Sequence, residues 1–165
     1  MDRNRTMKFR RGFSLIELLV VLAVMAVLAS VAMPLAQMTQ QREKERELKR
    51  ALWEIREALD GWRRAREVGA ILPVNGLNIS FYPPDLQTLS QPISDARPNR
   101  RGQTMRFLRR VPRDPFADTA VPAWQTWGLR SYQSEADQPQ AGADVFDVYS
   151  RSPQIGLNGV PLRQW

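Results

Sequence analysis

The first pattern along the chain is an apolar run near the amino terminus. Between Phe13 and Ala36 the only charged residue is Glu17. At about 1.5 Å per residue, a helix of this length spans roughly 36 Å, enough to cross the hydrocarbon core of a bilayer. Pro34 lies near the end of the run. Because proline removes one helical hydrogen bond and crowds the preceding turn, we expect a helix break there, in the form of a kink or local melting.

A charged stretch, QREKERELKR, follows at residues 41–50. Its opposite charges recur three or four residues apart, as on the solvated face of a helix: Glu43 with Arg46, Glu45 with Lys49, and Glu47 with Arg50. We therefore expect the helix to continue past the apolar run.

Beyond this stretch the apolar residues recur at steps of four and three, which is the pattern of an amphipathic helix: Leu48, Leu52, Ile55, Leu59 and Trp62. The stripe predicts one helix face packed against a folded body. We expect the helix to end near Gly69, because glycine readily adopts the left-handed conformation that closes a helix.

The rest of the chain predicts few regular elements. Residues 70–122 are rich in proline and predict loops with short helices, at Asp85 to Ser90 and at residues 105–110. Strand signals come later, at Trp124 to Tyr132 and at residues 145–150. The predicted fold class is α+β: a long amino-terminal helix, membrane-spanning in its first half and amphipathic in its second, packed against a small carboxyl-terminal antiparallel β-sheet.

Composition narrows the possible chemistry. The chain has no cysteine and no histidine, which excludes disulfides, thiolate metal sites and nucleophilic catalysis that depends on histidine. We expect no enzymatic activity. The formal charge is +7. The first twelve residues contribute +4 of it, from five basic residues and one acidic residue, and the remaining +3 is ordinary for a soluble surface.

Three interpretations fit a basic leader followed by an apolar run. A cleaved secretory signal would use the small residues Ser30-Val31-Ala32, but the apolar stretch before them is long for a signal peptide. A plain membrane anchor explains the length and the basic flank, yet leaves Glu17 as an unpaired charge near the membrane. The third interpretation gives Glu17 a purpose.

The segment from Gly12 to Val21, GFSLIELLVV, closely resembles the cleavage and methylation signature of type IV prepilins and type II secretion pseudopilins. The resemblance implies that a prepilin peptidase cuts between Gly12 and Phe13 and that the new amino group of Phe13 is N-methylated. Glu17 then becomes the fifth residue of the mature chain and pairs with that amino group on an adjoining subunit, which makes it an assembly residue. Proteins of this family also have a proline at the position of Pro34.

Five segments of the body resemble the major pseudopilin of type II secretion: YPPDLQTL, VPRDPF, WGLRSY, VFDVYS and GLNGVPLRQW. The resemblance implies five regions. They are a cleaved leader (1–12), a transmembrane and assembly helix (13–36), an amphipathic helix of the body (37–69), a loop-rich variable region (70–122), and the antiparallel sheet with a carboxyl-terminal loop (123–165).

The function that this resemblance implies is structural. The chain would be a pseudopilin subunit that polymerises through its amino-terminal helix into a periplasmic filament, which drives protein export by a type II secretion system. It would cross the bacterial inner membrane once, with its carboxyl-terminal body in the periplasm. The implied partners are the prepilin peptidase, further copies and other pseudopilins, the inner-membrane secretion platform, and the lipid bilayer before assembly.

The sequence offers two further candidate sites. Major pseudopilins often bind calcium in the loop after the last strand, but here no acidic residue follows Asp147. Ser150 and Asn158 are weak metal candidates, and we expect no cofactor.

The alternative function is that of a type IV pilin or minor pilin of a DNA-uptake or adhesion machine, binding DNA through the basic segment from Arg97 to Arg113. The acidic residues Asp95, Asp114 and Asp118 and the scarcity of aromatic residues argue against nucleic acid, so we expect a solvated surface or a subunit contact there.

Overall fold

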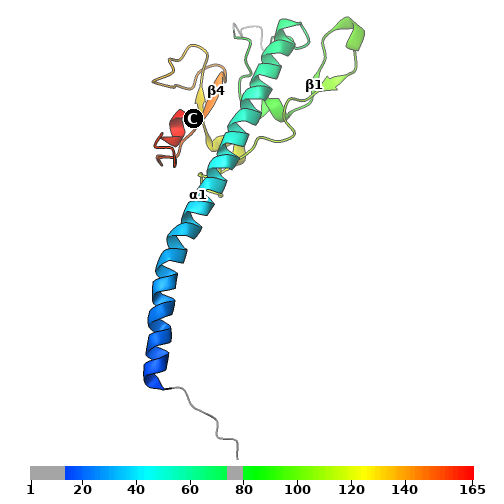
Figure 1. The fold of residues 1–165 in the computed structure, drawn as a ribbon. Coiled ribbons are helices and arrows are strands. Elements are labelled where there is room, and N and C mark those ends of the chain that lie inside the picture. Colours follow the sequence, from blue (N-terminus) through cyan, green and yellow to red (C-terminus); the bar gives the residue numbers. More distant parts are fainter. Residues whose placement is uncertain (1–13, 74–79) are drawn as a thin grey trace, which may run out of the picture. The chain divides into compact units, whose positions relative to one another are not determined.

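The computed structural model describes residues 14–73 and 80–165, with the backbone alone for residues 31–36. The chain divides into two compact units, Met1–Gln40 and Gln41–Trp165. One helix, α1 (Leu15–Glu67), contributes to both (Figure 1).

Helix α1 is continuous through Pro34. The helix therefore does not end at Pro34, and a break in the form of a kink at this residue stays a prediction. Among the helices of the described residues, none has both the length and the apolar character needed to cross a membrane.

The carboxyl end of α1 closes as its sequence predicts. Gly69 has a φ of 71°, in the left-handed region. Its N–H donates to the carbonyl of Arg66 at 3.1 Å, and the N–H of Ala70 donates to that of Ala65 at 2.8 Å. This pair of bonds is a Schellman motif, which satisfies carbonyls left without partners at a helix end.

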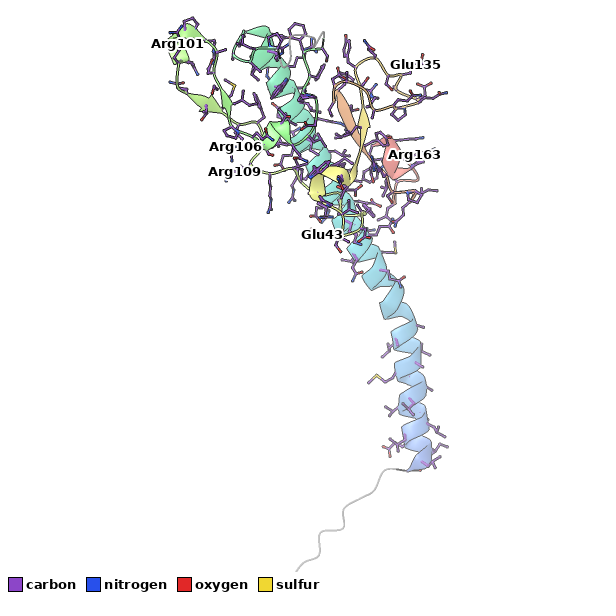
Figure 2. All side chains as sticks on the ribbon, turned by 180° about the vertical axis from the view of Figure 1, so that it is seen from behind. Glu43, Arg101, Arg106, Arg109, Glu135 and Arg163 are labelled. Atoms are coloured by element: carbon purple, nitrogen blue, oxygen red, sulfur yellow. The ribbon has the colours of Figure 1, made fainter. Side chains whose placement is uncertain are left out.

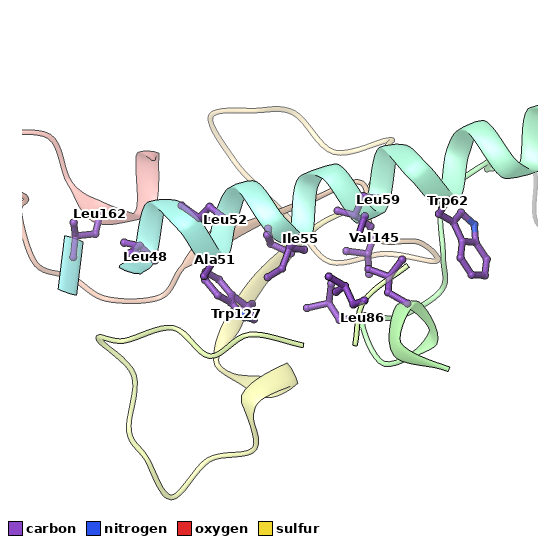
Figure 3. Close-up of a cluster of buried hydrophobic side chains, with 14 of the residues drawn as sticks. Leu48, Ala51, Leu52, Ile55, Leu59, Trp62, Leu86, Trp127, Val145 and Leu162 are labelled. Atoms are coloured by element: carbon purple, nitrogen blue, oxygen red, sulfur yellow. The ribbon is translucent and has the colours of Figure 1, made fainter. Parts of the chain in front are cut away.

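The amphipathic stripe of α1 forms one side of the core in the unit Gln41–Trp165. All five of its predicted residues are at most 3% exposed, which confirms the stripe: Leu48, Leu52, Ile55, Leu59 and Trp62. Across from them lie Leu86, Leu89, Trp127, Val145 and Leu162, from segments far apart in the sequence (Figure 3). Burial of these side chains is the main force holding the body on the helix.

Strand β3 (Trp127–Arg130) pairs in antiparallel register with β4 (Asp147–Ser150), from Trp127 opposite Ser150 to Arg130 opposite Asp147. The 3-10 turns η4 (Ala123–Gln125) and η5 (Leu162–Gln164) lie before β3 and near the carboxyl terminus. Val148 and Ser150 are buried while Asp147 and Tyr149 are partly exposed, so β4 alternates as its sequence predicts. The small antiparallel sheet is confirmed, with strands shorter than predicted.

A second antiparallel pair, which the sequence does not predict, joins β1 (Ile93–Ser94) to β2 (Thr104–Met105). The 3-10 turn η3 (Pro98–Arg100) lies between them. We call residues 93–110 the arginine hairpin. In Figure 1, β1 and β4 lie on opposite sides of the carboxyl-terminal part of α1.

Both short helices predicted in the loop region differ in the structure. The segment beginning at Asp85 forms only the 3-10 turn η2 (Thr88–Ser90), with the Asp85 carboxylate accepting from the Thr88 N–H at 2.8 Å. The helix predicted at residues 105–110 is wrong. There the N–H groups of Phe107 and Leu108 both donate to the carbonyl of Leu89, at 3.1 and 2.8 Å, so this backbone is bound to a distant turn rather than to itself.

Candidate functional site

The candidate assembly site lies at the amino-terminal end of α1. Ser14 precedes the first helical residue, Leu15, and its carbonyl accepts from the N–H of Leu18 at 3.2 Å. Gly12 and Phe13, the predicted cleavage and methylation positions, lie outside the described residues.

Glu17 lies in the first turn of α1 and its side chain is exposed. A carboxylate at this position interacts favourably with the partial positive charge of a helix amino terminus. Within residues 14–73 and 80–165, Glu17 forms no ion pair. Its carboxylate is therefore available to a cation supplied from elsewhere.

The apolar residues around Glu17 form a continuous exposed surface. Every leucine, isoleucine, valine and methionine from residue 15 to residue 28 is at least 49% exposed, with Leu15 at 76% and Val21 at 49%. Isolated exposed apolar residues are common on proteins, but a contiguous band on all sides of a helix marks a surface that lipid or protein covers.

The body contains a buried carboxylate on α1, at a position whose sequence predicts a solvated face. Glu45 is only 8% exposed. Its Oε1 accepts from the backbone N–H of Leu157 at 2.8 Å and from Nε2 of Gln41 at 3.1 Å. The predicted Glu45–Lys49 pair is wrong, because Lys49 lies over the ring of Trp165 instead, 4.5 Å from its centre. Glu45 thus fastens the carboxyl-terminal loop to the helix.

Arg56 makes a second connection between α1 and the carboxyl-terminal segments. Its Nε donates to Oδ1 of Asp147 at 2.9 Å, and its Nη2 donates to the carbonyls of Val148 and Trp165 at 3.2 and 2.8 Å. Arg130 adds a longer contact to Asp147 at 3.5 Å. A single guanidinium therefore holds both β4 and the last residue of the chain.

The side chains of the two weak metal candidates are both hydrogen-bonded to other groups of the protein. Ser150 is fully buried and donates to Oδ2 of Asp114 at 2.6 Å, while its hydroxyl accepts from the N–H of Ser152 at 3.1 Å. The side-chain oxygen of Asn158 accepts from the N–H of Val160 at 3.1 Å. Among the described residues there is no group of three or more acidic, histidine or cysteine side chains that could hold a metal ion.

The acidic residues that flank the basic segment are also engaged. Asp95 forms a two-pronged ion pair with Arg97, the shorter contact being 2.6 Å, and the hydrogen bonds from Arg97 lower the pKa of Asp95 to about 2. Asp114 is buried and bonded to Ser150. Asp118 is exposed, with its carboxylate accepting from the N–H of Ala120 at 2.9 Å.

Comparison with known proteins places a processing signal on the amino-terminal segment. The family model of the prokaryotic N-terminal methylation motif matches residues 7–33, which include Gly12, Phe13 and Glu17. No curated protein and no solved structure matches the chain. The motif implies processing by a prepilin peptidase and assembly with other pilin-type subunits, so it supports a type IV pilin-like, envelope-associated protein.

Proposed function

We propose that this chain is a structural pseudopilin subunit, which polymerises through the first half of α1 into a periplasmic filament of a type II secretion system. One observation carries the proposal: the exposed apolar band of residues 15–28 contains a single carboxylate, Glu17, which lies inside the matched processing motif. The subunit has a mechanical role, and we propose that it catalyses no reaction itself.

The exposed band needs two successive environments. Before assembly, residues 13–36 would lie in the inner membrane, with the body in the periplasm. Within this segment the structure describes the side chains of residues 14–30. In the filament, the same side chains would pack against the helices of neighbouring subunits. Apolar side chains on all sides of a helix suit both environments, because lipid and a helix bundle each remove them from water.

Glu17 would select the second environment over the first. Cleavage after Gly12 creates a positive charge at Phe13, and a carboxylate on an adjoining subunit neutralises it. Inside a dry helix bundle such a pair is favourable, whereas removing one partner from a buried pair typically costs ~3 to 5 kcal/mol. The pair would therefore fix the axial register between neighbouring subunits.

The specific assignment to type II secretion rests on the body. The chain lacks cysteine, whereas type IV pilins resemble one another in bearing a disulfide. The segments that resemble the major pseudopilin supply core residues here, including Leu86, Trp127 and Leu162. The alternative, a pilin of a DNA-uptake or adhesion machine, shares the amino-terminal chemistry. Deletion of the gene distinguishes them, because loss of protein export supports secretion, and loss of transformation or adhesion with normal export supports the alternative.

The assembly role is tested by Glu17→Gln, with Glu47→Gln as a matched control at an exposed position of the same helix that forms no ion pair among the described residues. We expect Glu17→Gln protein to be cut after Gly12 but to remain in the inner membrane without filaments. A loss of ~3 to 5 kcal/mol per contact lowers the association constant at least a hundredfold. Glu47→Gln should assemble normally. Filaments of Glu17→Gln as abundant as those of the wild type would refute the charge pair.

A further inference from the structure

The arginine hairpin has an unusual concentration of charge. Residues 95–113, which include most of the hairpin and extend three residues beyond it, hold seven arginines, no lysine and one acidic residue, Asp95, a formal charge of +6. The other residues of the unit Gln41–Trp165 hold twelve basic and fourteen acidic residues, a charge of −2. The net positive charge of the unit Gln41–Trp165 therefore comes from this segment.

Five of these arginines are exposed and form no ion pair with any described residue: Arg100, Arg101, Arg106, Arg109 and Arg110. The acidic residues near them in sequence neutralise little of their charge. Asp95 is bound by Arg97 at 2.6 Å, and Asp114 is buried against Ser150. Only Asp118 remains exposed.

Three of the five arginines follow one edge of the body, and Arg100 and Arg110 are adjacent in sequence to two of them. Figure 2 shows Arg101, Arg106 and Arg109 along the same edge, with Glu135 and Arg163 on the other side. Arg101 lies between the paired strands β1 and β2, and Phe107, which follows Arg106 in sequence, packs its ring on Trp62 with 5.5 Å between ring centres. The arginines are thus mounted on an ordered support.

We propose that this row of arginines binds the phosphate backbone of a double-stranded nucleic acid without reading its sequence. Guanidinium groups contact phosphates through two parallel hydrogen bonds and stay charged at every physiological pH. A row of separate positive charges along an edge matches the linear array of single negative charges on a duplex strand.

The same features disfavour the other anionic partners. Single strands are held largely by stacking on exposed aromatic rings, and the one aromatic residue of the hairpin, Phe107, is packed on Trp62. A second copy offers no matching acidic row, because Glu47 and Glu54 of α1 alternate with basic residues.

The test is binding of the full-length chain, in neutral detergent, to a short DNA duplex of arbitrary sequence over a series of salt concentrations. Five phosphate contacts predict a slope of about −4.5 in the logarithm of affinity against the logarithm of salt, or a loss of about 500-fold between about 50 and about 200 mM. Two scrambled duplexes should bind equally. Replacing Arg100, Arg101, Arg109 and Arg110 with alanine should reduce the slope to about −1.

The matched control removes four exposed arginines elsewhere: Arg42, Arg46, Arg151 and Arg163. Both variants lose the same net charge. The control should therefore keep the steep slope only if the duplex binds at the row of arginines and not to the net charge of the protein. The proposal is overturned if both variants weaken binding equally, if the wild type does not bind duplex, or if it binds polyglutamate or anionic vesicles more tightly than duplex. Binding should also persist in Glu17→Gln, which separates this proposal from the assembly role.

Discussion

The two halves of α1 differ in how far their apolar side chains are exposed. Leu22, in the first half, is 63% exposed, whereas Leu59, in the second, is 1% exposed. The second half meets its partners within the chain, since Leu86, Trp127 and Val145 lie against its stripe. The first half has apolar residues on all sides and its partner is not a described part of this chain. One half of the helix therefore builds the body, whereas the other half leaves its apolar side chains exposed within the described residues.

The sharpest test of this contrast makes the same substitution in both halves. Leu59→Ala should lower the free energy of unfolding of the body by ~2 to 5 kcal/mol, because it leaves a cavity in the core. Leu22→Ala should leave that value almost unchanged, since Leu22 has no core contacts to lose. Urea unfolding of the full-length protein in detergent, followed by tryptophan fluorescence, measures both. Equal losses would remove the distinction between the halves.

The polar attachment of the second half gives a smaller effect. Arg56→Met should cost about 2 kcal/mol or less, because three hydrogen bonds to Asp147, Val148 and Trp165 are lost at a side chain that is 40% exposed. Arg50→Met, at an exposed position of the same helix, should cost no more than about 0.5 kcal/mol. The same unfolding assay applies. If both variants behave alike, Arg56 does not hold the carboxyl-terminal segments.

A substitution at the carboxyl end of the second half should change the unfolding free energy by about 1 kcal/mol. Gly69→Ala should destabilise the body by about that amount, since its φ of 71° is left-handed and an alanine there pays the usual steric cost. Gly69→Asn should be milder, because asparagine tolerates this conformation. Thermal unfolding of the two variants compares them. A neutral Gly69→Ala would show that the helix end relaxes without its Schellman motif.

The smallest expected effect is a change in the unfolding free energy at acidic pH. Asp95 has a pKa of about 2 in the folded protein, lowered from 3.8 mainly by its hydrogen bonds from Arg97. A carboxyl whose folded pKa is depressed stabilises the fold above its ordinary pKa, and this contribution is lost as the pH falls from about 4 to about 2. The difference in unfolding free energy between the wild type and Asp95→Asn should therefore shrink over that interval. A constant difference would mean that the ion pair with Arg97 does not contribute to stability.

The sequence predicts the parts of this fold that depend on local pattern. Steps of three and four locate the buried stripe, a single glycine locates the end of α1, and alternation locates β4. Each of these signals lies within a few neighbouring residues. The processing motif is of the same kind, because its residues are contiguous and its match at residues 7–33 needs no knowledge of the fold.

The remaining features depend on contacts between distant segments. Glu45 has the sequence surroundings of an exposed helix residue, and only its bond to the N–H of Leu157 reveals that it is buried. The helix expected at residues 105–110 fails because Phe107 and Leu108 donate to Leu89. The exposed charge of the arginine hairpin likewise cannot be predicted from the sequence. By sequence alone, Asp95 and Asp114 would neutralise the arginines near them, whereas the structure shows that Asp95 pairs with Arg97 and Asp114 bonds to Ser150.

The most direct test of the central claim, a pilin-like subunit matured at its amino terminus, is an intact-mass measurement of the protein extracted from membranes of a cell with its native peptidase. The account predicts a single chain that begins at Phe13 and carries one added methyl group. A chain that begins at Met33 would indicate ordinary signal cleavage, and an uncut chain beginning at Met1 would indicate a plain anchor. Either result would contradict the account.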